Sequence, residues 1–222
     1  MKITVEQLAK MIDHTELKPN ATEERIRNLC SEAIEHGFGA VCVNGCNVQT
    51  AAKMLDGSGV AVCSVVGFPL GAMATSAKAY EARTAVEDGA AEIDMVLNVG
   101  ALKSRNLDNV RNDIAAVVAA VPSAFVKVIL ETGYLEEDEI VLACRLAEEA
   151  GAHFVKTSTG FGPRGATVED VRLMRKTVGD RLGVKAAGGI RTFEDAVAMI
   201  EAGATRIGAS RGVDILQGCC GT

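Results

Sequence analysis

The sequence predicts an α/β protein: a single (β/α)₈ TIM barrel with an N-terminal helix, formed by residues 1–222 as one domain. Short β-branched segments alternate with Ala- and Glu-rich segments of helical spacing, which is typical of parallel β-α-β units. Glycine recurs just before the predicted strands, at Gly37, Gly89, Gly151 and Gly203, where it can end the preceding helix. The length also suits a complete barrel, which takes about 200 residues or more.

The expected strands are runs of β-branched and other apolar residues, and the first is assigned because a closed barrel needs one more strand after the N-terminal helix. In chain order they are Met11–His14, Ala40–Val43, Val60–Val66, Glu92–Leu97, Phe125–Glu131, His153–Thr159, Gly183–Ala187 and Thr205–Ala209. Helices are expected at Glu23–Glu35, Ser76–Glu87, Asn106–Ala120, Glu136–Glu149, Val168–Val178 and Phe193–Glu201. An open doubly wound sheet is the alternative, but no Gly-x-Gly-x-x-Gly turn follows the first strand as a dinucleotide site would require.

Charge and composition exclude several classes of partner. The net charge is −6 and lysines and arginines do not cluster, so neither a nucleic acid nor an anionic membrane is an expected partner. The most apolar window, residues 60–74, is interrupted by Ser64, Gly67, Pro69 and Gly71, which argues against a membrane span. The seven cysteines are scattered except for Cys219 and Cys220, and Cys42 and Cys46 have no second ligand pair at zinc spacing. We therefore expect a cytoplasmic protein without a metal.

Charged residues occupy strand positions that should face the inside of the barrel. Side chains alternate between the two faces of a strand, and the larger apolar set should contact the surrounding helices. In four strands this rule places Asp94, Lys127, Lys156 and Lys185 on the inner face. One interpretation is a buried ion network that fixes the register of the barrel. A functional site is favoured, because clusters of perturbed charges in a cleft often mark such sites.

The excess of amines over carboxylates suits Schiff-base chemistry. A lysine at its reference pKa of about 10.4 is neutral in only about one molecule in a few thousand at pH 7, and only the neutral amine attacks a carbonyl. Burial and a second nearby ammonium can lower that pKa. Lys156 and Lys185 lie on adjacent strands, so one is the expected nucleophile and the other its electrostatic activator. Asp94, with a water molecule, is the expected proton carrier.

Glycine-containing loops after three strands predict an anion site. These loops contain Gly160, Gly188 with Gly189, and Gly208 with Ser210. The last two follow the strands after which barrels of this class commonly bind phosphate through backbone N–H groups. The alternative is that these glycines only begin the next helices.

Several motifs together resemble the deoxyribose-phosphate aldolase family over nearly the whole chain. They are Asp13-His14-Thr15, Glu92-Ile93-Asp94-Met95-Val96, Lys127-Val128-Ile129-Leu130-Glu131-Thr132, Phe154-Val155-Lys156-Thr157-Ser158-Thr159-Gly160-Phe161, Val184-Lys185-Ala186-Ala187-Gly188-Gly189-Ile190-Arg191 and Arg206-Ile207-Gly208-Ala209-Ser210. The resemblance implies that Lys156 forms the Schiff base, that Lys185 tunes it and that Asp94 carries protons. Asp13 and Lys127 would support this cluster.

The same resemblance implies a substrate and partners. The expected reaction is reversible cleavage of 2-deoxy-D-ribose 5-phosphate to acetaldehyde and D-glyceraldehyde 3-phosphate, without a metal or an organic cofactor. The phosphate would lie against Gly160, Gly188, Gly189, Gly208 and Ser210. By analogy the protein would be a homo-oligomer, with the dimer as the expected form.

A few positions depart from the family pattern. Glu16 replaces a frequent apolar residue, Gly45-Cys46 a frequent proline turn, and Arg211 a common second serine. None of these three changes removes a catalytic group. The chain also ends at Thr222 without the tyrosine tail of some relatives, so proton transfer assisted by such a tail is not expected.

Rival interpretations stay open at this point. They are a Schiff-base aldolase or transaldolase for another sugar phosphate, and a silent phosphate-binding barrel. Cys42 is expected either to be alkylated by unsaturated aldehydes or to be a buried inert thiol. His14, His36 and His153 do not form a catalytic triad.

Overall fold

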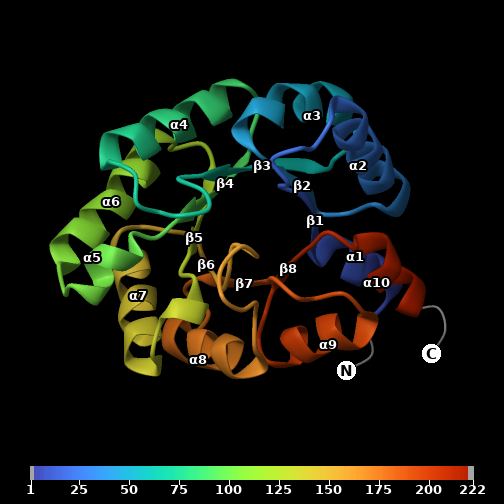
Figure 1. The fold of residues 1–222 in the computed structure, drawn as a ribbon. Coiled ribbons are helices and arrows are strands. Elements are labelled where there is room, and N and C mark those ends of the chain that lie inside the picture. The colour runs from blue at the N-terminus through green and yellow to red at the C-terminus, as the bar shows by residue number, and fades with distance from the viewer. Residues whose placement is uncertain (1–2, 220–222) are drawn as a thin grey trace.

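The chain folds into a closed barrel of parallel strands surrounded by helices (Figure 1), in a computed structural model that describes residues 3–219. Each strand pairs with its neighbours in sequence, and β8 closes the barrel against β1. The strands are β1 (Ile12–Glu16), β2 (Ala40–Val43), β3 (Ala61–Val66), β4 (Glu92–Val96), β5 (Phe125–Ile129), β6 (Phe154–Lys156), β7 (Gly183–Ala187) and β8 (Arg206–Ala209). The predicted (β/α)₈ barrel is confirmed, whereas Cys220 and the end of the chain at Thr222 lie outside the described residues.

Helices cover the outside of the barrel, and α1 precedes the first strand as predicted. They are α1 (Val5–Met11), α2 (Glu23–His36), α3 (Val48–Leu55), α4 (Thr75–Glu87), α5 (Val99–Lys103), α6 (Leu107–Ala120), α7 (Glu137–Glu149), α8 (Val168–Val178), α9 (Phe193–Glu201) and α10 (Gly212–Cys219). Short 3₁₀ turns lie at η1 (Gly45–Asn47) and η2 (Thr132–Tyr134). The sequence analysis did not specify α3, α5 and α10. None of the helices within residues 3–219 is both long and apolar enough to cross a membrane.

Three predicted strands end earlier than expected: β4 by one residue, at Val96, and β5 and β6 by more. β5 ends at Ile129 because Glu131 has a φ of 55°, outside the extended region. β6 ends at Lys156 because the next residue uses its side chain in the sheet: Thr157 Oγ1 donates to the Ala187 carbonyl at 3.0 Å and accepts from the Ala187 N–H at 3.0 Å. The chain then turns toward the mouth of the barrel.

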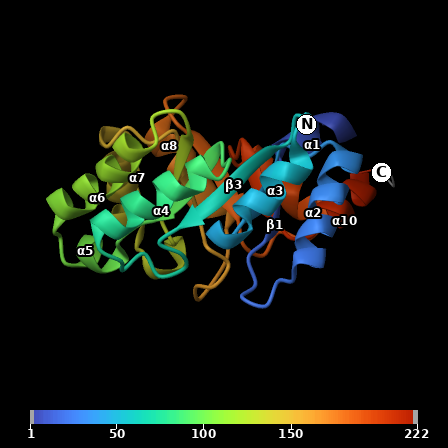
Figure 2. The same cartoon turned by 90° about the horizontal axis from the view of Figure 1, so that it is seen from above.

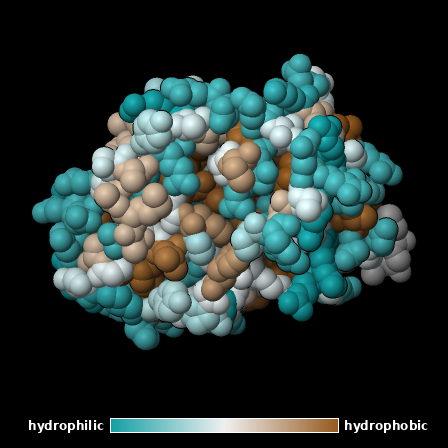
Figure 3. Space-filling model, turned by 45° about the horizontal axis from the view of Figure 1, so that its top comes forward, coloured by the Kyte–Doolittle hydropathy of each residue, from teal (hydrophilic) through white to brown (hydrophobic). Residues whose placement is uncertain are grey.

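Two layers of different polarity meet at the strands. Apolar side chains of the strands and helices form one large core outside the barrel, whereas the inside holds buried charged residues and a small apolar cluster of Leu17, Cys42, Cys63 and Val65. The loops after β1 and β6, blue and orange-yellow in Figure 2, project from the same end of the barrel. On the face shown in Figure 3, hydrophilic side chains dominate the periphery and apolar ones gather toward the middle. The loops after β1, β6, β7 and β8 surround the pocket described below.

A buried ion pair fastens two outer helices to the barrel. Lys78 of α4 donates to Asp113 of α6 at 2.6 Å and to the Val96 carbonyl at the end of β4 at 2.9 Å. Thr75 donates to the other oxygen of Asp113 at 2.8 Å. Lys78 is fully buried, so its ammonium depends on these acceptors.

We expect Asp113→Asn to lower the free energy of unfolding by about 3–5 kcal/mol, because it leaves the Lys78 ammonium buried without a counter-charge. Urea-induced unfolding measures this loss. Asp108→Asn on the same helix is the matched control, since Asp108 and Arg111 form an exposed pair that contributes little. Equal losses in the two variants would contradict the prediction.

Candidate active site

Asp94 of β4 binds three lysines at once inside the barrel. Its Oδ1 lies 2.8 Å from Lys127 Nζ, and its Oδ2 lies 2.8 Å from Lys156 Nζ and 2.7 Å from Lys185 Nζ. The strand register produces this arrangement, because Asp94 lies opposite Lys127 in the β4–β5 pair and Lys156 lies opposite Lys185 in the β6–β7 pair. The structure therefore brings together all four charged residues that face alternation selected.

A second group of charges lies around this centre. Asp13 of β1 binds Lys185 through Oδ2 and Arg206 Nη1 through Oδ1, the latter at 2.6 Å. Glu92 binds Arg206 Nη2 at 2.8 Å and Lys127 Nζ at 2.6 Å. Each carboxylate thus has at least two cationic partners.

The sequence analysis missed Glu92 and Arg206 as members of this cluster. Face alternation could have found both, because Glu92 precedes Asp94 by two residues and Arg206 precedes Gly208 by two residues. With them, the cluster contains three carboxylates, three ammonium groups and one guanidinium. Glu92 and Arg206 carry opposite charges, so adding them leaves the excess of positive charge in the cluster unchanged.

The charges determine which groups stay ionised. Burial acts to raise the pKa of Asp94, but Lys127, Lys156 and Lys185 outweigh it and hold that pKa well below its usual range. Burial acts to lower the pKa of Lys185, but Asp13 and Asp94 outweigh it and raise that pKa. Lys185 therefore remains an ammonium at neutral pH.

A pocket of about 730 Å³ opens above this cluster at the carboxyl ends of the strands. Lys156 lines it, whereas Asp13, Asp94, Lys127 and Lys185 do not, and these four are fully buried beneath it. All the residues predicted to bind an anion also line it; they are Gly160, Gly188, Gly189, Gly208 and Ser210. Lys156 is therefore the one of these three lysines that shares the pocket with the residues predicted to bind an anion.

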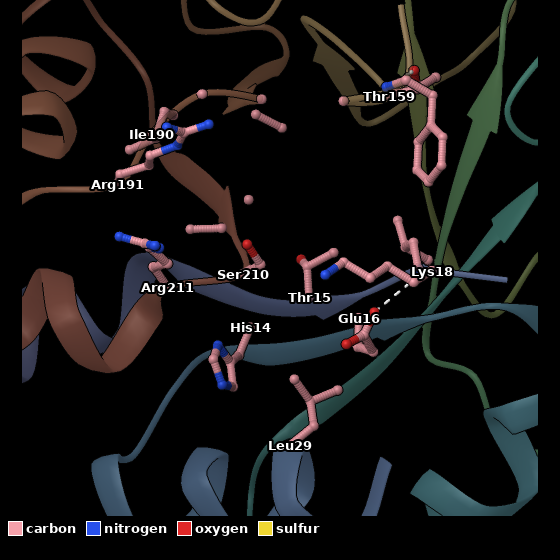
Figure 4. Close-up of a pocket in the computed structure, with 18 of the residues that line it drawn as sticks. His14, Thr15, Glu16, Lys18, Leu29, Thr159, Ile190, Arg191, Ser210 and Arg211 are labelled. Carbon is pink, nitrogen blue, oxygen red and sulfur yellow. Dashed lines mark hydrogen bonds between the residues drawn. The ribbon is translucent and has the colours of Figure 1, made fainter. Parts of the chain in front are cut away.

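Further polar side chains surround the pocket (Figure 4). Arg191 and Arg211 lie on the same side of it as Ser210, and Glu16 and Lys18 are labelled on the opposite side. His14 also lines the pocket, but its Nε2 lies 2.6 Å from Glu32, which agrees with a structural role. Arg191 and Lys18 were not selected from the sequence, although Arg191 directly follows the Gly-Gly loop.

Glycine is required at two of these positions for different reasons. Gly188 has a φ of +90°, which disfavours any other residue. A Cβ on Gly208 would lie 2.9 Å from Ala187 Cβ and 3.1 Å from Lys185 Cε, so the bare backbone there leaves space for the lysine.

Two cysteines lie beside Asp94 inside the barrel. Ligand atoms of Cys42, Cys63 and Asp94 lie within 4.8 Å of one another, and Cys63 donates to Asp94 at 3.2 Å. Asp94 already contacts three lysine amines, so a cation bound there would be repelled by these lysines. Cys42 is fully buried and is not among the residues that line the pocket, which favours the buried thiol over the alkylation site.

Comparisons with known proteins show which family the chain resembles. Residues 7–218 match the family described as DeoC/LacD family aldolase. The deoxyribose-phosphate aldolase of Caldanaerobacter subterraneus subsp. tengcongensis is 61% identical over 95% of this chain and 92% of its own. That of Thermococcus gammatolerans is 62% identical over 95% and 96%. The structure of the Aeropyrum pernix deoxyribose phosphate aldolase, described as tetrameric, superposes with a TM-score of 0.90 at 37% identity, over 96% of this chain and 91% of that one.

The carboxylates of this cluster predict a loss of stability in acid. The folded-state pKa of Asp94 lies below its unfolded value of about 3.9, so its ion pairs stabilise the fold above that pH. This stabilisation is lost as the pH falls through the folded-state pKa. We expect the free energy of unfolding to decline below about pH 4, and Asp94→Asn to reduce that slope by up to about 1.4 kcal/mol per pH unit.

Urea unfolding at a series of pH values, from neutral to acidic, measures the slope. Asp108→Asn, on the exposed side of α6, is the control. A slope that is the same in the wild type and in Asp94→Asn would show that Asp94 does not carry this dependence.

Proposed function

The chain belongs to the DeoC/LacD family of aldolases, and from that premise we propose that it cleaves 2-deoxy-D-ribose 5-phosphate reversibly through a Schiff base on Lys156. The products are acetaldehyde and D-glyceraldehyde 3-phosphate, which places the reaction in deoxyribose phosphate breakdown. One observation carries the proposal: of Lys127, Lys156 and Lys185, Lys156 alone lines the pocket. Lys127 and Lys185 are buried beneath the pocket, where they form ion pairs with Glu92 and Asp13.

The first part of the reaction forms a covalent bond between enzyme and substrate. The neutral amine of Lys156 attacks the C1 aldehyde, and the resulting carbinolamine loses water to become a protonated imine. Lys185 stays charged next to Lys156, because both contact Asp94 Oδ2. Lys185 thereby places a positive charge beside the reacting nitrogen of Lys156, which is its proposed activating role.

The second part breaks the carbon–carbon bond. The C3 hydroxyl gives up its proton, the C2–C3 bond breaks, and its electron pair moves into an enamine while D-glyceraldehyde 3-phosphate leaves. Protonation at C2 and hydrolysis of the imine then release acetaldehyde and restore Lys156. Asp94, whose Oδ2 lies 2.8 Å from Lys156 Nζ, carries these protons through a water molecule. Asp13 and Lys127 support the reaction by keeping Lys185 and Asp94 in place.

The phosphate of the substrate would occupy the glycine-lined side of the pocket. Gly160, Gly188 and Gly189, in the loops after β6 and β7, and Gly208, within β8, line this side without a side chain, and Ser210 adds a hydroxyl. Backbone N–H groups of the loop glycines would bind the phosphate. Arg191 and Arg211 line the same pocket and add local positive charge. This charge attracts the phosphate although the whole chain has a net charge of −6.

We also propose that the chain acts in the cytoplasm as a homo-oligomer, with the dimer as the expected form. Large apolar side chains exposed on the surface, Leu70 and Tyr80 among them, are compatible with an interface between copies. The tetramer described for the Aeropyrum pernix relative also supports association.

Trapping with acetaldehyde and sodium borohydride tests the Schiff base. We expect reduction to add one ethyl group to the protein and peptide mapping to place it on Lys156, because this amine is the one that reaches the pocket. Lys156→Arg should not be ethylated, whereas Lys185→Leu should still be ethylated at Lys156. An unmodified wild-type protein would contradict the mechanism.

Release of D-glyceraldehyde 3-phosphate from 2-deoxy-D-ribose 5-phosphate tests the substrate in the same preparations. Ethylation of Lys156 without this release would indicate an aldolase for another sugar phosphate.

We expect kcat/KM of Lys185→Leu to fall about tenfold or more at neutral pH and to recover at higher pH, because the variant removes the ammonium beside Lys156 and leaves Asp94 as its charged neighbour. The pH profile of kcat/KM measures this change. Lys176→Leu, an exposed position on α8, is the control, and an unchanged acid limb in Lys185→Leu would refute the activating role.

A further inference from the structure

Glu131, just beyond the end of β5, has an unusual backbone conformation. Its φ and ψ are 55° and 61°, in the left-handed region that few non-glycine residues adopt, and its side chain is buried. Its two neighbours are held to the next strand: Leu130 N donates to the Lys156 carbonyl at 2.9 Å, and Thr132 N to the Thr157 carbonyl at 3.0 Å. Such conformations persist where the surroundings hold them, and they concentrate at functional sites.

The carboxylate of Glu131 is bound by one residue of the loop after β6. Thr159 N lies 3.3 Å from each carboxylate oxygen, and Thr159 Oγ1 donates to Oε2. The same hydroxyl accepts from Phe161 N at 3.0 Å. The carboxylate therefore holds two backbone amides of this loop, one directly and one through the threonine hydroxyl, with Gly160 between them.

The loop also packs directly on this carboxylate. A Cβ on Gly162 would lie 2.7 Å from Glu131 Cδ and 2.8 Å from Oε1, so a side chain at position 162 would displace the carboxylate from its present place against the turn of residues 159–162. By contrast, a Cβ on Gly160, whose φ is +85°, would meet nothing within 4 Å, because Gly160 faces the pocket. Thr159, Gly160 and Phe161 line the pocket, and Glu131 lies behind them.

We propose that Glu131 is a positioning residue, whose carboxylate holds the turn of residues 159–162 so that the Gly160 backbone can bind the phosphate of the substrate. This inference rests on the proposed function. A carboxylate suits the task better than a neutral acceptor, because hydrogen bonds to a charged oxygen are stronger. Both carboxylate oxygens accept from Thr159, which lines the pocket, whereas Glu131 does not line it, so Thr159 separates the negative charge from the proposed phosphate position.

The dissociation constant of inorganic phosphate, measured by calorimetry, tests this role without any need for turnover. We expect Glu131→Ala to weaken phosphate binding about tenfold, since it removes the charged acceptor that orders the turn. Glu131→Gln, which keeps one acceptor oxygen, should restore part of the loss. Thr159→Val breaks the same hydrogen bond from the other end, and combining it with Glu131→Ala should add little further loss.

Steady-state kinetics with two sugars distinguish a positioning role of Glu131 from a general loss of structure. In Glu131→Ala we expect KM for 2-deoxy-D-ribose 5-phosphate to rise about tenfold, with kcat changed less than about threefold. With unphosphorylated 2-deoxy-D-ribose, kcat/KM should match the wild type. Glu139→Gln is the control, because Glu139 is also a buried carboxylate, bound to the Glu136 N–H, but lies on α7 away from the pocket.

Two results would overturn the inference: unchanged phosphate binding in Glu131→Ala, or an equal loss of kcat/KM with both sugars. If Glu131→Ala does not fold, Glu131→Gln and Thr159→Val carry the same comparison. If the wild type is not trapped at Lys156 but Glu131→Ala still weakens phosphate binding, the proposed function fails and the positioning role stands. If the wild type cleaves its substrate and the variants lose nothing selectively, the positioning role alone fails.

Discussion

The interaction on which the site depends is the sharing of the Asp94 carboxylate among Lys127, Lys156 and Lys185. A single ammonium in a protein interior costs several kcal/mol unless it has a partner. Three of them can lie side by side here because one carboxylate accepts all three. Asp13 also binds Lys185, Glu92 also binds Lys127, and both bind the Arg206 guanidinium. The network keeps Lys185 charged, which is the condition that the proposed activation of Lys156 requires.

Depth within the barrel separates the roles of similar side chains. Lys127 and Lys185 are sealed below the pocket, while Lys156 lies at its floor although only 3% of it is exposed. Above Lys156 the loops after β6, β7 and β8 present bare backbone, and the missing Cβ of Gly208 leaves space for the Lys185 side chain. The same glycine therefore serves the ion network below and the pocket above.

Face alternation predicted much of this site because a strand reverses side-chain direction at every residue, whatever it pairs with. That rule placed Asp94, Lys127, Lys156 and Lys185 inside the barrel. It also applies to Glu92 and Arg206, the first residues of β4 and β8, which were overlooked. It could not predict the ends of β5 and β6. Those ends depend on the left-handed backbone of Glu131 and on the bonds of Thr157 to Ala187, which exist only once neighbouring strands are in place.

By itself, then, the sequence determined the barrel and the inward direction of its charged residues, because both follow from local periodicity and from the alternation of strands and helices. The tertiary structure decided which lysine reaches the pocket, which carboxylate is shared and which residue supports the glycine turn. These outcomes required closure of the barrel, since β1 and β7, distant in the sequence, together hold Asp13 and Lys185 within one network around Asp94. A pattern along one strand contains no information about contacts made across the barrel.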